Sequence, residues 1–156
     1  MIRAAALMLL LSVAPVAAQE ACSIWTAGMQ EDEGGPVFTA SACAIDRPDA
    51  YLLLTCSERE VFIRYDLAAG AERSPDLGEV TDIDFTVGIS TQRLSMSYQE
   101  MDGMFAADVP ANGPLLALMK TGEALSIVDA AGRYPAHNFG LAGSSAALAK
   151  LAAQCR

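Results

Sequence analysis

The chain has 156 residues, 53% of hydrophobic type, and a formal net charge of −9 at neutral pH. This length fits one domain with one core. The acidic balance excludes a nucleic-acid-binding or anionic-lipid-binding surface, because such surfaces depend on clustered Lys and Arg, and the lysines here are Lys120 and Lys150 alone. We interpret the acidity as an aid to solubility.

The first twenty residues have the pattern of a secretory signal peptide. Arg3 precedes an apolar run over residues 4–13, and Pro15 and small residues follow it. The run is shorter than the about 20 apolar residues of a membrane-spanning helix, and no later segment is long enough either. We predict cleavage near Ala18, which removes residues 1–18, and a periplasmic or secreted product with one β-rich domain over residues 19–156.

The first half of this domain predicts a series of strands. Residues 22–27 predict a short strand with Trp25 in the core, and the acidic residues 30–36 predict a loop. Apolar and alternating stretches then predict strands over residues 37–45, 51–56 and 59–67, of which the last two form a hairpin. Residues 68–78 are rich in turn formers and predict a surface loop.

The second half contains the strongest local signal. After a strand over residues 80–87, Asp102 and Gly103 lie between two alternating segments, which favours a two-residue type I′ turn. This turn would pair Met101 with Met104 and Glu100 with Phe105. A final pair of strands is predicted over residues 123–130 and 133–141.

Two short helices complete the prediction. The first covers residues 114–120 with Asn112 as its cap, and the second is a C-terminal helix capped by Ser144. The second helix has one apolar stripe, formed by Leu148, Leu151, Ala152 and Cys155, that would face the sheet. The fold class is therefore mainly β, with α+β as a variant. We expect an antiparallel sandwich or partly open barrel of about eight short strands, with the helices packed on it.

Export carries four cysteines into an oxidising compartment: Cys22, Cys43, Cys56 and Cys155. Two disulfides are expected, and sequence alone does not choose among the three possible connectivities. We predict Cys22 with Cys43 and Cys56 with Cys155, because this pairing ties the N-terminal strand to its neighbour and the last helix to the sheet.

Two segments of the chain form recognisable motifs: LLLTCSEREVFIRY, residues 52–65, and F-x-L-x-G-S-x-x-A-L-x-x-L-x-x-x-C, residues 139–155. These segments resemble a group of bacterial periplasmic proteins that includes accessory proteins encoded with type VI secretion systems. The resemblance covers residues 50–156, and its shared positions are mostly structural: Cys56, Phe139, Gly143, Leu148, Leu151 and Cys155. It implies a periplasmic location and the fold of that group, and it carries over no catalytic residue.

The ingredients of a hydrolytic triad are present as His137, Asp129 and either Ser144 or Ser145. The sequence has no G-x-S-x-G motif, and Ser144 is already explained as a helix cap. Catalysis at His137 is therefore an alternative, and we predict no catalytic residue.

Metal and partner sites have similarly weak signals. Asp82 and Asp84 share one strand face and could share a cation, but alternating acids usually mark a solvated face, and so does the acidic run at residues 31–33. There is no C-x-x-C or H-x-x-x-H motif, so no metal or cofactor is predicted. Met96, Met101 and Met104 near the Asp-Gly turn could form an apolar partner surface, although their alternation favours the core.

The sequence has few candidate nucleophiles, general bases and metal ligands, which indicates a non-catalytic function. We expect an exported accessory domain that binds a protein or cell-envelope component. Two alternatives stay open at this point: a small secreted hydrolase that uses His137, and a protease-inhibitor-like module on a disulfide-bonded sandwich.

Overall fold

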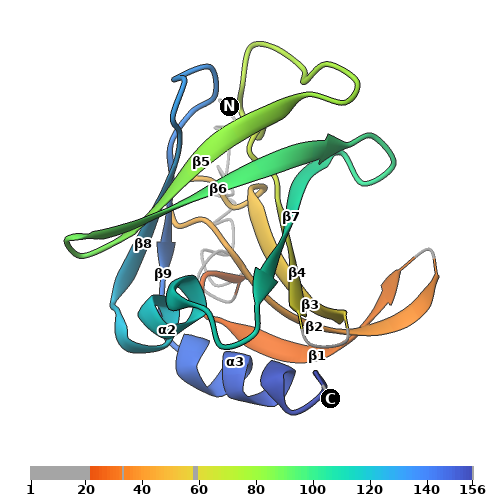
Figure 1. Ribbon diagram of the computed structural model, residues 1–156, viewed down its shortest axis with the longest axis vertical. Helices are drawn as coiled ribbons and strands as arrows, with labels where there is room; N and C mark the ends of the chain where they lie inside the picture. The colour runs from red at the N-terminus through yellow and green to blue at the C-terminus, as the bar shows by residue number, and fades with distance from the viewer. Residues whose placement is uncertain (1–21, 33, 58–59, 156) are drawn as a thin grey trace, which may run out of the picture.

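The computed structural model describes residues 22–32, 34–57 and 60–155 (Figure 1). The predicted signal peptide lies outside these residues. Nine antiparallel strands form a single sheet in the spatial order β1–β2–β3–β4–β7–β6–β5–β8–β9. The strands are β1 (Thr26–Asp32), β2 (Gly35–Cys43), β3 (Tyr51–Ser57), β4 (Glu60–Tyr65), β5 (Val80–Val87), β6 (Ser90–Gln99), β7 (Met104–Pro110), β8 (Ala124–Asp129) and β9 (His137–Gly140).

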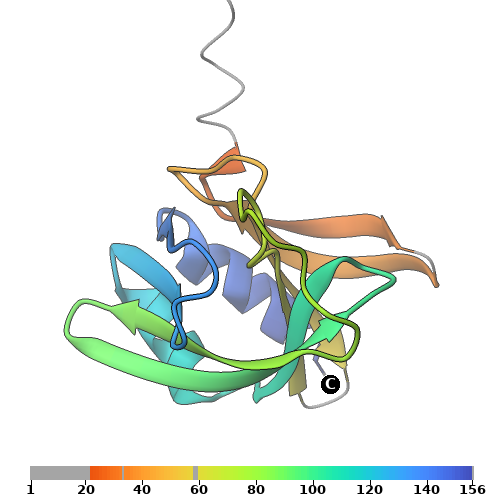
Figure 2. The same ribbon diagram turned by 90° about the horizontal axis from the view of Figure 1, so that it is seen from above.

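Alternating side chains curve this sheet around one core. In β5, Ile83, Phe85 and Val87 are buried, whereas Asp82 on the opposite face is exposed. This period of two is typical of a sheet with one dry face and one wet face. Figure 2 shows the sheet wrapped around the interior, which confirms the predicted mainly β fold of the partly open type.

The two ends of the sheet approach each other without closing it. Within the described chain no strand ladder joins β9 to β1. Individual bonds connect the ends instead: Ile45 N–H donates to Asn138 O at 2.7 Å, and Trp25 Nε1–H donates to Gly140 O at 2.9 Å. Trp25 is buried, as predicted, and its indole N–H is satisfied by the backbone of β9.

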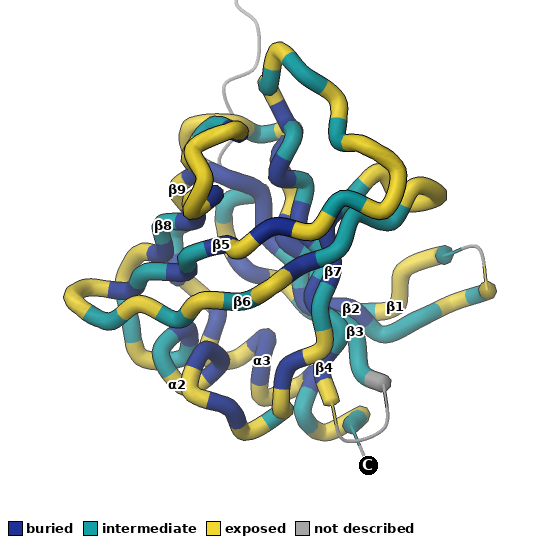
Figure 3. Tube along the Cα trace, turned by 45° about the horizontal axis from the view of Figure 1, so that its top comes forward, coloured by how far each residue is buried: buried dark blue, intermediate teal, exposed yellow. Residues whose placement is uncertain are grey.

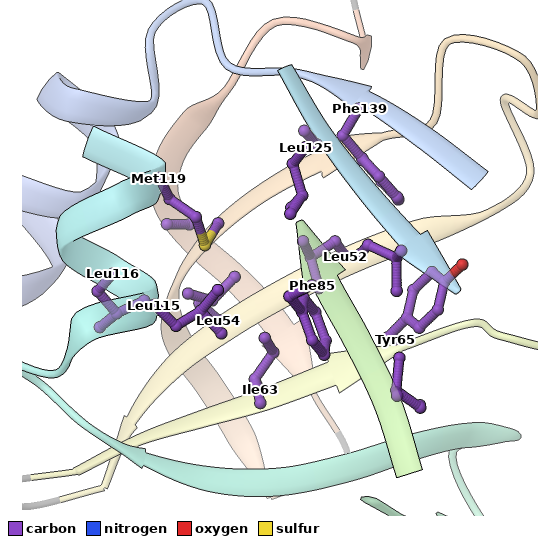
Figure 4. Packing of buried hydrophobic residues seen from close by; sticks show 14 of the residues in the cluster. Leu52, Leu54, Ile63, Tyr65, Phe85, Leu115, Leu116, Met119, Leu125 and Phe139 are labelled. Atoms are coloured by element: carbon purple, nitrogen blue, oxygen red, sulfur yellow. The ribbon is translucent and has the colours of Figure 1, made fainter. Parts of the chain in front are cut away.

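The interior is filled by aromatic and branched aliphatic side chains from opposite walls (Figure 4). Tyr65 of β4 and Phe139 of β9 meet edge to face across it, with ring centroids 6.0 Å apart. Fully buried side chains contribute most of the hydrophobic stabilisation. The largest of them are Tyr65, Phe85, Phe105, Phe139, Leu52, Leu54, Ile63, Leu67, Ile83, Met96, Met119 and Leu125.

Two helices, α2 (Pro114–Thr121) and α3 (Ser144–Ala152), cover one end of the curved sheet (Figure 1). Leu148 and Leu151 are buried and Lys150 is exposed, so the predicted apolar stripe of α3 does face the sheet. None of the described helices has the length and apolar character that a membrane crossing requires.

The two predicted N-caps, Asn112 and Ser144, are wrong. Gly113 and Gly143 occupy the two N-cap positions, and neither helix has a side-chain cap bond. The hydroxyl of Ser144 is buried and lies 2.6 Å from Met119 O and 2.7 Å from Leu141 O, so it can donate to either carbonyl. Ser144 therefore joins α3 to α2, because a buried hydroxyl needs a partner and the nearest acceptors lie on those segments.

Both predicted disulfides are present. Cys22 is joined to Cys43, and Cys56 of β3 is joined to Cys155, which follows α3. The second bridge spans 99 positions of the chain and holds the C-terminus against the sheet.

The predicted register of the β6–β7 hairpin is wrong. Gln99 pairs with Met104 and Tyr98 with Phe105, so residues 100–103 form a four-residue loop, in which Gly103 has a φ of 66°. The predicted two-residue turn would place Glu100 opposite Phe105, on the buried face. The observed register instead brings the rings of Tyr98 and Phe105 to 5.4 Å, so core packing outweighs local turn preference.

The N-terminal hairpin also differs from the prediction. The first strand starts at Thr26 and continues to Asp32, through residues predicted as a loop. It pairs with β2 along its whole length, from Thr26 with Ser41 to Asp32 with Gly35. Pairing with a neighbour therefore overrides the weak strand preference of the acidic residues.

Replacing both cysteines of the Cys56–Cys155 bridge with serine should destabilise the protein more than the same replacement of Cys22 and Cys43. In loop-closure theory a bridge over roughly 100 residues contributes about 5 kcal/mol, and one over roughly 20 contributes about 3 kcal/mol. Urea unfolding of the two double variants measures this difference. Equal losses would show that the length of the closed loop does not govern the stabilisation.

Candidate functional site

His137, the centre of the predicted alternative triad, is buried inside the barrel on β9. Its Nδ1 lies 2.5 Å from the Tyr65 hydroxyl, and its Nε2 lies 3.1 Å from Ala69 O. A carbonyl can only accept, so Nε2 carries the hydrogen and Nδ1 accepts from Tyr65. Burial lowers the pKa of His137, although Asp46 and Asp66 favour its charged form, and the ring is therefore held in one neutral tautomer.

The three residues of the alternative triad are not brought together. The ring nitrogens of His137 are engaged by Tyr65 and Ala69, and Ser144 is bonded to α2 and Leu141. Asp129 accepts from Thr81 at 2.6 Å and from Arg133 N–H at 2.7 Å. No described contact forms the nucleophile–base–carboxylate chain that the hydrolase alternative needs.

Asp84, one of the two candidate cation ligands on β5, is paired with an arginine. Arg93 donates from Nε to Asp84 Oδ1 and from its terminal nitrogen to Oδ2, each at 2.7 Å, and this pairing lowers the pKa of Asp84. Asp82 is exposed. Among the described residues, no group of three or more potential ligands is placed to hold a metal ion.

The three methionines near the β6–β7 hairpin occupy different environments. Met96 is fully buried in the core, Met104 is half-buried, and Met101 is exposed in the loop. They do not form one methionine surface, because the observed register separates Met101 from the strand pair.

A polar cluster lies at the end of the barrel opposite the helices, between residues 66–79 and 130–136 (Figure 1). Its centre is the buried carboxylate of Glu79, which accepts from both terminal nitrogens of Arg73, from Arg133 and from the Tyr134 hydroxyl, at 2.9–3.1 Å. Burial and Glu79 raise the pKa of Tyr134 to about 12.

Hollows border this cluster on two sides, one of them lined by Arg73, Arg133 and Tyr134. Both guanidinium groups also lie over the Tyr134 ring, 5.2 and 5.8 Å from its centre. Arg73 also pairs with Asp76 and Arg133 with Asp129, so three carboxylates compensate the two cations and the hollows carry no excess of positive charge. The cluster fastens two loops together.

A different surface has the character of a binding site, and we call it the outer face. It is the face of β2, β3, β4 and β7 that points away from the core. Register and alternation place on it Thr39, Leu53, Phe62, Arg64 and Ala106. Leu53 and Phe62 are partly exposed and do not belong to the core cluster, so they form a second apolar patch.

Arg64 links two hairpins across this outer face. One terminal nitrogen is 2.9 Å from Asp32 of β1, and the other is 3.4 Å from Asp102 in the β6–β7 loop. Figures 1 and 2 show the β1–β2 and β6–β7 hairpins on the same side of the molecule, with β3 and β4 between them. The side chain of Arg64 is only 11% exposed, so this pairing is screened less than an ordinary surface ion pair.

Two buried polar atoms of the outer face have no hydrogen-bond partner among the described residues. They are Arg64 Nε and Thr39 Oγ1, and Thr39 itself is 1% exposed. Buried polar atoms are nearly always paired, because an unpaired one costs about 1–3 kcal/mol. These two buried and unpaired polar atoms distinguish the outer face from an ordinary solvated sheet surface.

The rim of the outer face is acidic. Asp108 is the register partner of Phe62, Glu60 lies two residues before it on β4, and both are exposed. Asp32 and Asp102 share the single charge of Arg64. The face therefore combines an apolar centre with an excess of negative charge.

Sequence reasoning missed this surface. The residues of the Arg64 bridge lie 32 and 38 positions apart in the chain, so no local motif contains them. A signal was available in β4, where Phe62 and Arg64 alternate with the core residues Val61, Ile63 and Tyr65. An aromatic residue on the outward side of such a strand marks a surface that is not simply solvated.

Compared with known proteins, the chain matches no family model, no curated protein sequence and no solved structure. The contacts of its own residues are therefore the basis for any assignment of function.

Buried His137 should make stability depend on pH. Its pKa in the folded chain lies below the ordinary 6.5, so between these two values the unfolded chain binds more protons and stability rises with pH. We expect the free energy of unfolding to fall as pH is lowered from 7.5 to 5.5, by at most about 1.4 kcal/mol per pH unit. Urea unfolding at each pH measures the fall.

His137→Gln cannot ionise and should be less stable at pH 7.5, without a further loss in this window. Asp66→Asn provides the control. Burial raises the pKa of Asp66, and a carboxyl whose pKa is raised on folding stabilises the folded chain as the pH falls, so Asp66 should not cause the loss of stability. An unchanged pH profile in His137→Gln would contradict the assignment of the fall to the imidazole.

Proposed function

We propose that the protein is an exported, non-catalytic accessory domain that binds a protein partner through its outer face. The observation that carries this proposal is the combination on one sheet face of partly exposed apolar side chains, Leu53 and Phe62, with an acidic rim that includes Glu60 and Asp108. A partner that covers this face would remove apolar surface from water.

Two disulfides support a location outside the reducing cytoplasm, since such bonds persist in oxidising compartments. Cleavage of residues 1–18 and release into the periplasm belong to the proposal. The resemblance of residues 50–156 to periplasmic proteins of type VI secretion systems agrees with an accessory role, and we include that association in the proposal.

The arrangement of polar groups supports binding rather than chemistry. Both ring nitrogens of His137 are hydrogen-bonded inside the core. The carboxylates of Glu79 and Asp129 accept hydrogen bonds that hold loops together. A general base must reach a proton on a bound substrate, and these groups are turned away from solvent.

A photo-crosslinking amino acid tests the outer face directly. Benzoylphenylalanine at position 62 should form a discrete adduct with an envelope protein in cells, because Phe62 lies at the apolar centre of the face. The same amino acid at position 128 is the matched control, since Val128 is an outward-facing and exposed strand residue on β8, far along the sheet.

An adduct at position 62 that is absent at position 128 supports the proposal. Equal labelling at both positions, or no adduct at position 62, would overturn the outer face as the binding site. A hydrolytic activity of the purified protein that disappears in His137→Ala would overturn the non-catalytic assignment.

A further inference from the structure

The two edge strands of the sheet, β9 and β1, differ in how many of their backbone groups are hydrogen-bonded to other segments of the chain. At the β9 edge, Ile45 N–H donates to Asn138 O, the carboxylate of Asp46 accepts from the backbone and side-chain amides of Asn138, and Trp25 donates to Gly140 O. These contacts occupy backbone groups that would otherwise accept another strand.

The helix α3 packs beside β1, but the β1 edge has no equivalent hydrogen-bonded cover among the described residues. The hydrogen bonds found among the described residues join Ala27–Glu31 to β2 alone, through the strand ladder and a side-chain bond from Gln30 to Ser41. Alternate residues of an edge strand direct N–H and C=O groups away from the sheet. In Figures 1 and 3 the far half of the β1–β2 hairpin projects beyond the body, with exposed residues at Met29, Gln30 and Glu31.

The sequence of β1 lacks the usual protection of an edge strand. Such edges commonly carry lysine, proline or a bulge, whereas β1 reads TAGMQED and pairs with β2 residue by residue without a bulge. An edge left open in this way on a projecting hairpin is suited to strand addition, in which a partner peptide pairs with the sheet through its main chain.

We propose that β1 is a second binding site, which accepts an extended, cationic segment of a partner protein as an additional antiparallel strand. The charge pattern selects this occupant. Glu31 is exposed on β1, so a strand with lysine or arginine opposite Glu31 gains a favourable cross-strand pair.

A second copy of the chain fits this edge less well. Each copy carries a formal charge of −9, and its β1 offers acids and no basic side chain to the opposing strand. Like charges repel, and salt would therefore strengthen pairing of two copies but weaken pairing with a cationic strand. The sign of the salt dependence thus separates the two occupants.

The site is independent of the outer face, because it consists of main-chain groups at the sheet edge rather than of Phe62 and its neighbours. Its test is also separate from the crosslinking experiment. Amide hydrogen exchange of the whole domain is followed by NMR with and without two synthetic nine-residue peptides, one alternating valine with lysine and the other alternating valine with glutamate.

The lysine peptide should slow the exchange of amides within Gly28–Glu31, and the glutamate peptide should not. Raising the salt concentration should weaken the lysine peptide's effect. Glu31→Gln should weaken its binding by about two- to fivefold, the scale of an exposed ion pair. Glu123→Gln, which removes an equally exposed glutamate next to β8, should leave binding unchanged.

Three outcomes would overturn the proposal. The first is that the lysine peptide binds without slowing exchange in β1. The second is equal weakening by Glu31→Gln and Glu123→Gln, which would show non-specific charge attraction. The third is protection of β1 without peptide, increasing with protein concentration and with salt, which would identify a second copy as the occupant.

Discussion

The attachment of α3 to the inside of the sheet is the constraint on which the rest of the structure depends. The nine-stranded sheet curves but does not close, so one end of its apolar interior must be covered by another element. Leu148 and Leu151 of α3 supply the apolar cover, Ser144 joins α3 to α2, and the Cys56–Cys155 bridge fixes the segment after α3 to β3. Without this cover, the interior would be open to water at that end.

At the opposite end, polar contacts hold the loops. Glu79 accepts hydrogen bonds from two arginines and from Tyr134. Asp129 accepts hydrogen bonds from the hydroxyl of Thr81 and from the backbone N–H groups of residues 131 and 133. Burial raises the pKa of each carboxyl, but the hydrogen bonds outweigh it and lower the pKa of both. Acidic and basic residues that resemble a polar site are thus used for structure.

At the β6–β7 hairpin, the turn preference of the local sequence and the packing of the core favour different registers, and the structure has the register that the core favours. Asp102 and Gly103 favour a tight turn, yet the register that this turn imposes would bury Glu100 opposite Phe105. Moving the pairing by two residues on β6 costs a preferred turn and brings Tyr98 to that position. The same reason explains Ser144, whose capping preference is weaker than the need of its buried hydroxyl for a partner.

The sequence by itself determined the fold class, most strand positions and the apolar stripe of α3, because alternation and helical periodicity report which side chains must leave water. Only the tertiary structure decided hairpin register, the tautomer of His137 and the bridge from Arg64 to Asp32 and Asp102. These features join residues far apart in the chain, and a periodic pattern within one strand contains no information about which distant side chain lies opposite. The outer face was hidden from sequence analysis for the same reason.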